Sequence, residues 1–216
     1  MEDITAVLTG DFIGSTEAEP NRLERSMAEL ATQAGFISDA IDHDTRFTRF
    51  RGDGWQIHLP SPSHFLWITV YLNAMLRSDP NGFLPTRIAI GVGQTDRLGR
   101  TGLSDASGTA FIESGRALDD MVVAGQTIAL KGEKTDAIQR STIAFIDERI
   151  SGWSPEQAEV VRLKLKPGHD PTQADIAAIL GISRQAVGSR FQTAGLSLVL
   201  KACDAFRDHN WQARDV

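Results

Sequence analysis

The chain has 216 residues, of which 41% are hydrophobic and 23% charged, and its net charge is −6. This balance is typical of a globular protein and excludes a disordered, fibrous or repetitive chain. There is no run of about 18 apolar residues, so we expect no membrane span. The acidic start lacks the zones of a signal peptide, and the single cysteine, Cys203, excludes an internal disulfide. We therefore expect a cytoplasmic protein.

The charge is divided unevenly along the chain. Residues 1–150 hold 14 Lys and Arg against 21 Asp and Glu, a net −7, whereas residues 151–216 hold 8 against 7, a net +1. A split of this kind predicts different partners for the two parts. Because Ser151 and Gly152 also interrupt the helical pattern, we expect a first domain over 1–150 and a second over 151–216.

The first 150 residues alternate between strand and helix patterns. Predicted strands cover 4–9, 45–51, 55–59, 85–93 and 128–130, and predicted helices cover 20–43, 62–77, 109–120 and 133–149. Pro20 suits the first turn of its helix, and the Gly52-Asp53-Gly54 turn predicts a hairpin. The order contains the βαββαβ pattern of a ferredoxin-like sheet, an α+β fold, for which we expect the helices on one face.

Only helices are predicted after Ser151, and the segment 172–190 has the pattern of a helix-turn-helix. Gly181 can take the left-handed conformation that the turn needs, Ser183 can cap the second helix, and Val187 faces inward. The side chains that remain exposed are suited to hydrogen bonding with base edges in a major groove. The first helix begins where contacts with DNA phosphates are usual. The predicted DNA-binding residues are Thr172, Gln173, Ser183, Arg184, Gln185, Ser189 and Arg190.

The sequence TQADIAAILGISRQAVGSR resembles the helix-turn-helix of sigma-factor region 4 and related bacterial regulators. The resemblance implies double-stranded DNA as a partner. Gly188 departs from the pattern, since a serine or a helix former is common there, and glycine weakens a helix by up to about 1 kcal/mol relative to alanine. A plain helical hairpin, or an intact motif that serves protein contacts, are the alternatives.

Two aspartates stand at turns of the predicted sheet. Asp11 follows the first strand and Asp53 lies in the hairpin turn, and these strands are neighbours in a ferredoxin-like sheet. Two close carboxylates repel each other unless a cation lies between them, and Mg²⁺ takes one or two carboxylates together with phosphate oxygens. The backbone N–H groups of Gly14, Ser15 and Thr16 could hold those phosphates. The alternative is that Asp11 caps a turn and Asp53 is ordinary hairpin chemistry.

These motifs, with Arg87-Ile88-Ala89-Ile90-Gly91-Val92-Gly93 on the later strand, resemble the catalytic domain of class III nucleotide cyclases. The resemblance is closer still to the SatD-like proteins, in which such a domain is often followed by a helix-turn-helix. It implies that Asp11 and Asp53 bind Mg²⁺ or Mn²⁺ with a purine nucleotide, that Arg49 recognises the base, and that Arg116 is a candidate catalytic residue. It also implies a homodimer. Ile112 stands where cyclases have an asparagine, and isoleucine donates no hydrogen bond.

The leading hypothesis is a DNA-binding transcriptional regulator whose cyclase-like domain dimerises and binds a nucleotide. The alternative is an enzyme, a metal-dependent nucleotide cyclase or nucleotidyl transferase, against which Ile112 counts. A third possibility is a structural dimer with a vestigial pocket. The five histidines show no zinc spacing.

Overall fold

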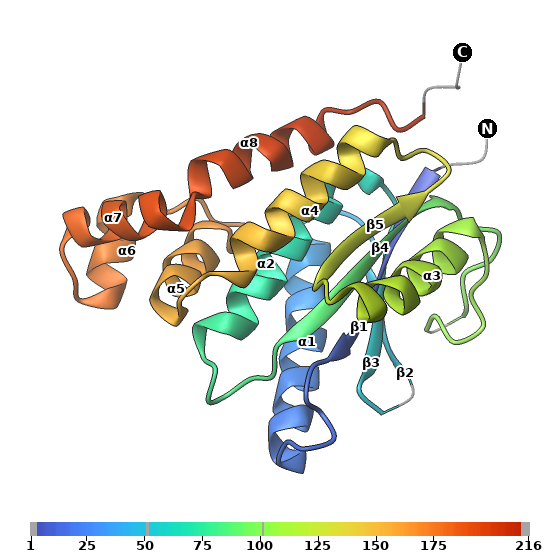
Figure 1. Cartoon of the computed structure of the whole chain (residues 1–216), viewed down its shortest axis with the longest axis horizontal. Helices are drawn as coiled ribbons and strands as arrows, with labels where there is room; N and C mark the ends of the chain where they lie inside the picture. Colours follow the sequence, from blue (N-terminus) through green and yellow to red (C-terminus); the bar gives the residue numbers. More distant parts are fainter. Residues whose placement is uncertain (1–3, 51, 101, 213–216) are drawn as a thin grey trace.

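The computed structural model describes residues 4–50, 52–100 and 102–212, and it confirms an α+β fold built on a five-stranded mixed sheet. The elements in chain order are β1 (Ile4–Phe12), α1 (Pro20–Ile41), β2 (Arg46–Phe50), β3 (Gly54–Leu59), a 3₁₀ turn η1 (Pro62–His64), α2 (Phe65–Ser78), β4 (Thr86–Gln94), α3 (Thr109–Ala124), β5 (Ile128–Gly132), α4 (Ala137–Ser151), α5 (Pro155–Lys164), α6 (Gln173–Leu180), α7 (Arg184–Ala194) and α8 (Leu196–Arg207) (Figure 1). Among these described helices, none is both long and apolar enough to cross a membrane.

The sheet has the order β2-β3-β1-β4-β5, in which the first four strands are antiparallel neighbours and β5 runs parallel to β4. The predicted βαββαβ order is therefore confirmed, with β5 as an additional strand. The expectation that the helices lie on one face is wrong. Whereas α1 and α2 share the main core with Ile88 and Ile90 of β4, α3 packs on the opposite face against Ala89.

Small residues of β4 explain why α3 packs so closely on this second face. A Cβ atom added at Gly91 would lie 2.1 Å from the carbonyl oxygen of Ala110 and 2.4 Å from the backbone nitrogen of Ser114. Since both of these atoms are backbone of α3, the helix could not keep its position above a larger residue. The glycine therefore sets the distance between α3 and the sheet.

The predicted element bounds differ most from the structure at the end of α3, which reaches Ala124 instead of residue 120, and at the start of α4. The start of α4 lies at Ala137 instead of residue 133, because Asp136 caps the helix and forms a reciprocal capping box with Gln139. In α5, Ser154 caps the helix and forms a capping box with Gln157.

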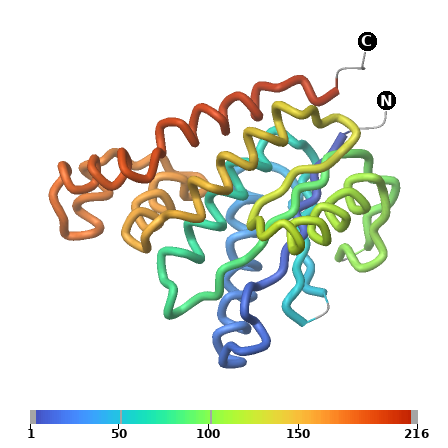
Figure 2. The backbone as a smooth tube through the Cα atoms, in the orientation of Figure 1, coloured from blue at the N-terminus to red at the C-terminus, as the bar shows by residue number. Residues whose placement is uncertain are grey.

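The helices after Gly152 pack against α2 and extend the main core. Buried side chains of α5 and α8, among them Val161 and Val199, belong to the same hydrophobic cluster as Leu8 of β1. Trp153 is anchored there by its indole N–H, which donates to the carbonyl oxygen of Ala194 (2.8 Å). The proposed boundary at residue 151 thus falls between helices that share one core. Meanwhile α6 and α7 lie at the end of the molecule farthest from the sheet (Figures 1 and 2).

Candidate functional site

Strand pairing brings Asp11 and Asp53 to the same corner of the sheet. β1 pairs with β3 so that Asp11 stands opposite Gly54, the residue after Asp53. The predicted adjacency of the first strand and the hairpin is confirmed. The two carboxylates are close enough for the charge of Asp53 to act on the pKa of Asp11.

A buried chain of hydrogen bonds fixes the backbone at Asp11. The indole N–H of Trp55 donates to the hydroxyl of Thr86 (3.0 Å), and that hydroxyl donates to the carbonyl oxygen of Asp11 (2.7 Å). Trp55 is fully buried and Thr86 nearly so. The tryptophan ring also requires a glycine beside it, because a Cβ atom at Gly10 would lie 2.4 Å from the ring. The main chain that carries Asp11 is therefore tightly held.

The carboxylate of Asp11 is partly buried, and only one of its two oxygens has a hydrogen-bond partner among the described residues. Its Oδ2 accepts from Nη1 of Arg87 at 2.7 Å, whereas Oδ1 is buried and has no hydrogen-bond partner among the described residues. Burial raises the pKa of Asp11, Arg87 lowers it, and the charge of Asp53 raises it, with a net upward shift. A buried oxygen without a partner is costly and needs an explanation, such as a cation.

The loop after β1 approaches Asp53. The hydroxyl of Ser15 donates to Oδ2 of Asp53, which joins the two motifs that the sequence predicts to cooperate. Gly14 has a φ of 71° and so reverses the chain in a conformation that favours glycine. Within the described residues, the backbone N–H groups of Gly14, Ser15 and Thr16 have no hydrogen-bond acceptor. These three predicted phosphate contacts therefore lie together and have free donors.

Arg49 is engaged by a residue that the sequence did not single out. Its guanidinium forms a two-pronged pair with Glu24 of α1 (2.7 and 2.8 Å), and its Nε donates to the carbonyl oxygen of Gly52 (2.6 Å). This hydrogen bond with Arg49 lowers the pKa of Glu24. The arrangement ties the hairpin to α1, and Arg49 would have to leave Glu24 to contact a base.

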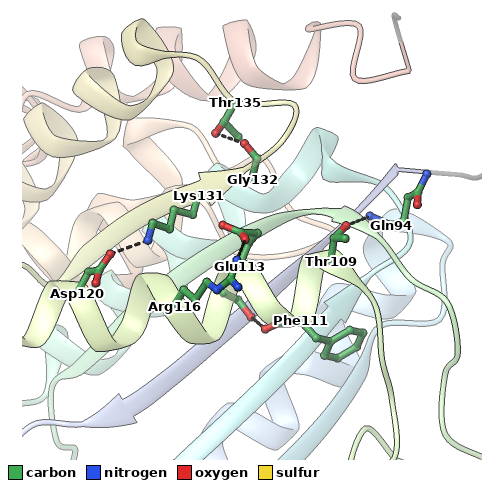
Figure 3. Close-up of polar contacts among 10 residues, drawn as sticks. Gln94, Thr109, Phe111, Glu113, Arg116, Asp120, Lys131, Gly132 and Thr135 are labelled. Carbon is green, nitrogen blue, oxygen red and sulfur yellow. Dashed lines mark hydrogen bonds and ion pairs between the residues drawn. The ribbon is translucent and has the colours of Figure 1, made fainter. Parts of the chain in front are cut away.

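Arg116 lies on the outer side of α3 (Figure 3). Its side chain is 65% exposed and forms an ion pair with Glu113 at 2.7 Å. Within the part of the chain that the structure describes, it has no hydrogen bond or ion pair with Asp11 or Asp53. The structure therefore does not bring Arg116 to the two aspartates of its own chain. Ile112, one turn earlier, is 51% exposed on the same helix.

The two aspartates fit a divalent cation that arrives with other ligands. Across residues 4–50, 52–100 and 102–212, no group of three or more His, Cys, Asp or Glu side chains could hold a metal by itself. Two carboxylates are nevertheless what Mg²⁺ uses where phosphates and water complete its coordination. The partnerless Oδ1 of Asp11 is consistent with such an ion.

The helix-turn-helix pattern is present as two helices joined by a tight turn. Gly181 ends α6 with a φ of 65°, and the hydroxyl of Ser183 accepts from the N–H of Ala186 (3.1 Å) to cap α7. Ile176 and Val187 are fully buried together with Val160 of α5. The predicted turn, cap and inward residue are confirmed.

The predicted DNA-binding side chains fall into two groups. Arg184, Gln185 and Ser189 are exposed on α7, and their side chains have no hydrogen-bond partner among the described residues. By contrast, Arg190 is 27% exposed and forms an ion pair with Glu159 of α5 (3.3 Å) instead of lying fully outside. Thr172 caps α6 and donates to the carboxylate of Asp175 (2.7 Å).

Gln173 is the first residue of α6, and its side chain extends towards α7. A Cβ atom at Gly188 would be 3.5 Å from its Oε1, so the glutamine side chain reaches α7.

Arg87 belongs to a motif that the sequence indicates, but its ion pair with Asp11 was not predicted, and neither were the contacts of Thr86 and Glu24. The contact of Arg87 could have been predicted from strand alternation. Arg87 stands two residues before Ala89, so its side chain points to the same face of β4, which is also the face to which Asp11 points. Glu24 gave no such signal, since its contact with Arg49 spans 25 residues and two different elements.

No protein-family model and no curated protein match this chain. Solved structures similar to it include a bacterial light-regulated adenylyl cyclase, with 14% identity and a TM-score of 0.41, where the match covers 60% of this chain and 76% of that one. Another is the guanylyl cyclase Cya2, with 16% identity and a TM-score of 0.38, covering 60% and 77%. Both TM-scores lie below 0.5.

Proposed function

We propose that this chain is a DNA-binding regulator that contacts duplex DNA through α7 and carries a cation-dependent nucleotide site on its sheet. The observation that supports DNA binding is the exposed first turn of α7, where Arg184 and Gln185 project without partners from a capped helix. Arginine and glutamine are suited to guanine and adenine edges in a major groove. α6 and α7 lie at the end of the molecule away from the sheet (Figure 1).

A mobility-shift assay with fragments of the upstream region of its own gene tests this proposal. We expect a specific shift, and Arg184→Ala should weaken it by about 1–3 kcal/mol if the arginine reads a guanine. Arg140→Ala is the matched control, since Arg140 is an exposed arginine of α4 on another helix. Absence of any shift, or equal losses in both variants, would contradict recognition by α7.

Dimerisation is part of the same proposal. The segment 151–216 has a net charge of only +1, so one copy gains little from phosphate attraction. Two copies would double this charge and place two α7 helices against a palindromic site. Sedimentation of the full chain at micromolar concentration should therefore give a dimer, and a monomer at the concentration that shifts DNA would contradict it.

A second candidate function, nucleotide binding, is favoured by the partnerless Oδ1 of Asp11. Asp11 and Asp53 would hold Mg²⁺ or Mn²⁺, and the free N–H groups of Gly14, Ser15 and Thr16 would bind phosphate oxygens. A bound ion would neutralise phosphate charge at this corner. Titration calorimetry with ATP and GTP, with and without Mg²⁺, should show binding that requires the cation and is lost in Asp53→Asn. Lack of binding would leave a structural dimer.

Turnover by a nucleotide cyclase or nucleotidyl transferase is the alternative for this site. Arg116 is exposed and would have to act on a second copy, and Ile112 provides no hydrogen bond. We therefore propose binding without cyclisation. Incubation with ATP or GTP and Mn²⁺, followed by mass spectrometry, tests the distinction. A cyclic product that disappears in Asp53→Asn would replace this proposal with an enzymatic one.

A further inference from the structure

Arg87 forms an ion pair with the carboxylate of Asp11. The two residues stand opposite each other in the pairing of β1 with β4, and both point to the face that α3 covers. Nη1 of Arg87 lies 2.7 Å from Oδ2 of Asp11, and the two side chains are 25% and 26% exposed. Asp11 is the single hydrogen-bond partner of the Arg87 side chain among the described residues.

This ion pair places a fixed positive charge where a bare metal ion would bind. A divalent cation that approaches Oδ1 of Asp11 meets the guanidinium already held by Oδ2 of the same carboxylate. The two positive charges repel each other at short range, and partial burial reduces screening by water. A cation without its own anionic ligands is therefore disfavoured.

A phosphate chain changes this balance. The guanidinium has five N–H donors in a planar arrangement, and the pair with Asp11 uses one. The remaining donors have the geometry that suits phosphate oxygens. The Asp11–Arg87 pair thus offers a carboxylate to a cation and a guanidinium to an anion side by side.

We propose that Arg87 is the specificity-determining residue that makes this site accept a divalent cation only as the chelate of a nucleoside di- or triphosphate. Bare cations and nucleoside monophosphates are rejected. In the empty site, Arg87 stabilises the Asp11 carboxylate. In the occupied site, its guanidinium contacts the polyphosphate. The inference rests on the cation–nucleotide site proposed above.

Calorimetry on the full chain tests it with four titrants: Mn²⁺ alone, Mg²⁺ with ATP, Mg²⁺ with AMP, and ATP with a chelator. For wild type we expect binding of Mg²⁺–ATP and at least about tenfold weaker binding of the others. In Arg87→Met, the affinity for Mg²⁺–ATP should fall by about tenfold or more. The affinity for Mn²⁺ alone should rise at least about threefold, because the competing positive charge is gone. A merely structural role would weaken both.

Two further variants keep the outcomes separate. If Asp53→Asn and wild type both bind no Mg²⁺–nucleotide, the proposed site itself is refuted. If wild type binds and Arg87→Met shifts both affinities in the same direction, or neither, the role of Arg87 is refuted while the site stands. Should Arg87→Met not fold by circular dichroism, Arg87→Lys decides. A loss of about threefold or more for Mg²⁺–ATP with unchanged Mn²⁺ affinity supports the inference, and unchanged Mg²⁺–ATP affinity overturns it.

Discussion

Replacing Thr86 by valine should destabilise the protein by leaving a buried donor without a partner. Valine keeps the shape of threonine but removes the hydroxyl that accepts from Trp55 and donates to Asp11. Because Trp55 is fully buried, water cannot replace the lost acceptor. An unsatisfied buried donor costs about 1–3 kcal/mol. For a chain of this length, each kcal/mol lowers the melting temperature by roughly 2–4 °C.

A double-mutant cycle with Trp55→Phe isolates this contribution. Urea unfolding followed by circular dichroism would give the free energy of unfolding for wild type, both single variants and the pair. Phenylalanine has no N–H, so Thr86→Val should cost at least about 1 kcal/mol less in that background. Strictly additive losses would refute the argument that the Trp55–Thr86 hydrogen bond holds the strand end at Asp11.

Three further predictions concern α3, the sheet and α7. Gly91→Ala should lower the free energy of unfolding by about 1–3 kcal/mol, because its Cβ would collide with the backbone of α3. The control Gly115→Ala on that helix has open space around its Cβ and should be neutral or stabilising. Equal melting temperatures of the two variants would contradict this prediction. Burial lowers the pKa of His58 from 6.5 to about 4 in the folded chain. As pH drops from about 6.5 towards 4, the unfolded chain therefore binds a proton that the folded chain does not, and the free energy of unfolding falls. Between pH 7 and pH 5 the loss should be roughly 2 kcal/mol larger in wild type than in His58→Gln, and parallel pH profiles in urea unfolding would exclude His58 as the cause. Gly188→Ala should stabilise α7 by up to about 1 kcal/mol, since its Cβ would meet Gln173 at an ordinary 3.5 Å; a lower melting temperature would show that the helix needs the glycine.

Local patterns predicted much of this fold because they act over a few residues. Strand patterns, turn glycines and a capping residue located β1, the hairpin and the cap at Ser183. The neighbourhood of Asp11 and Asp53 followed from the ferredoxin-like order alone. What failed was the placement of α3, because its side of the sheet depends on the parallel crossover from β4 to β5 and on the small residue Gly91.

The electrostatic partners within the sites were not predictable from sequence. The contact between Arg49 and Glu24 and the one between Arg190 and Glu159 each join elements distant in the chain. Long charged side chains reach several positions, and spacing does not choose among them.

The core shared by the sheet, α2 and the C-terminal helices has a mechanical consequence. Since Val161, Val199 and Leu8 belong to one hydrophobic cluster, α5 and α8 cannot swing on a hinge without exposing that cluster to water. A truncation at residue 151 would leave α2 with an uncovered apolar flank and should yield a fragment that aggregates. In the dimer proposed above, two such rigid chains would hold their α7 helices at a fixed separation, and the proposed DNA half-sites would need a fixed spacing to match it.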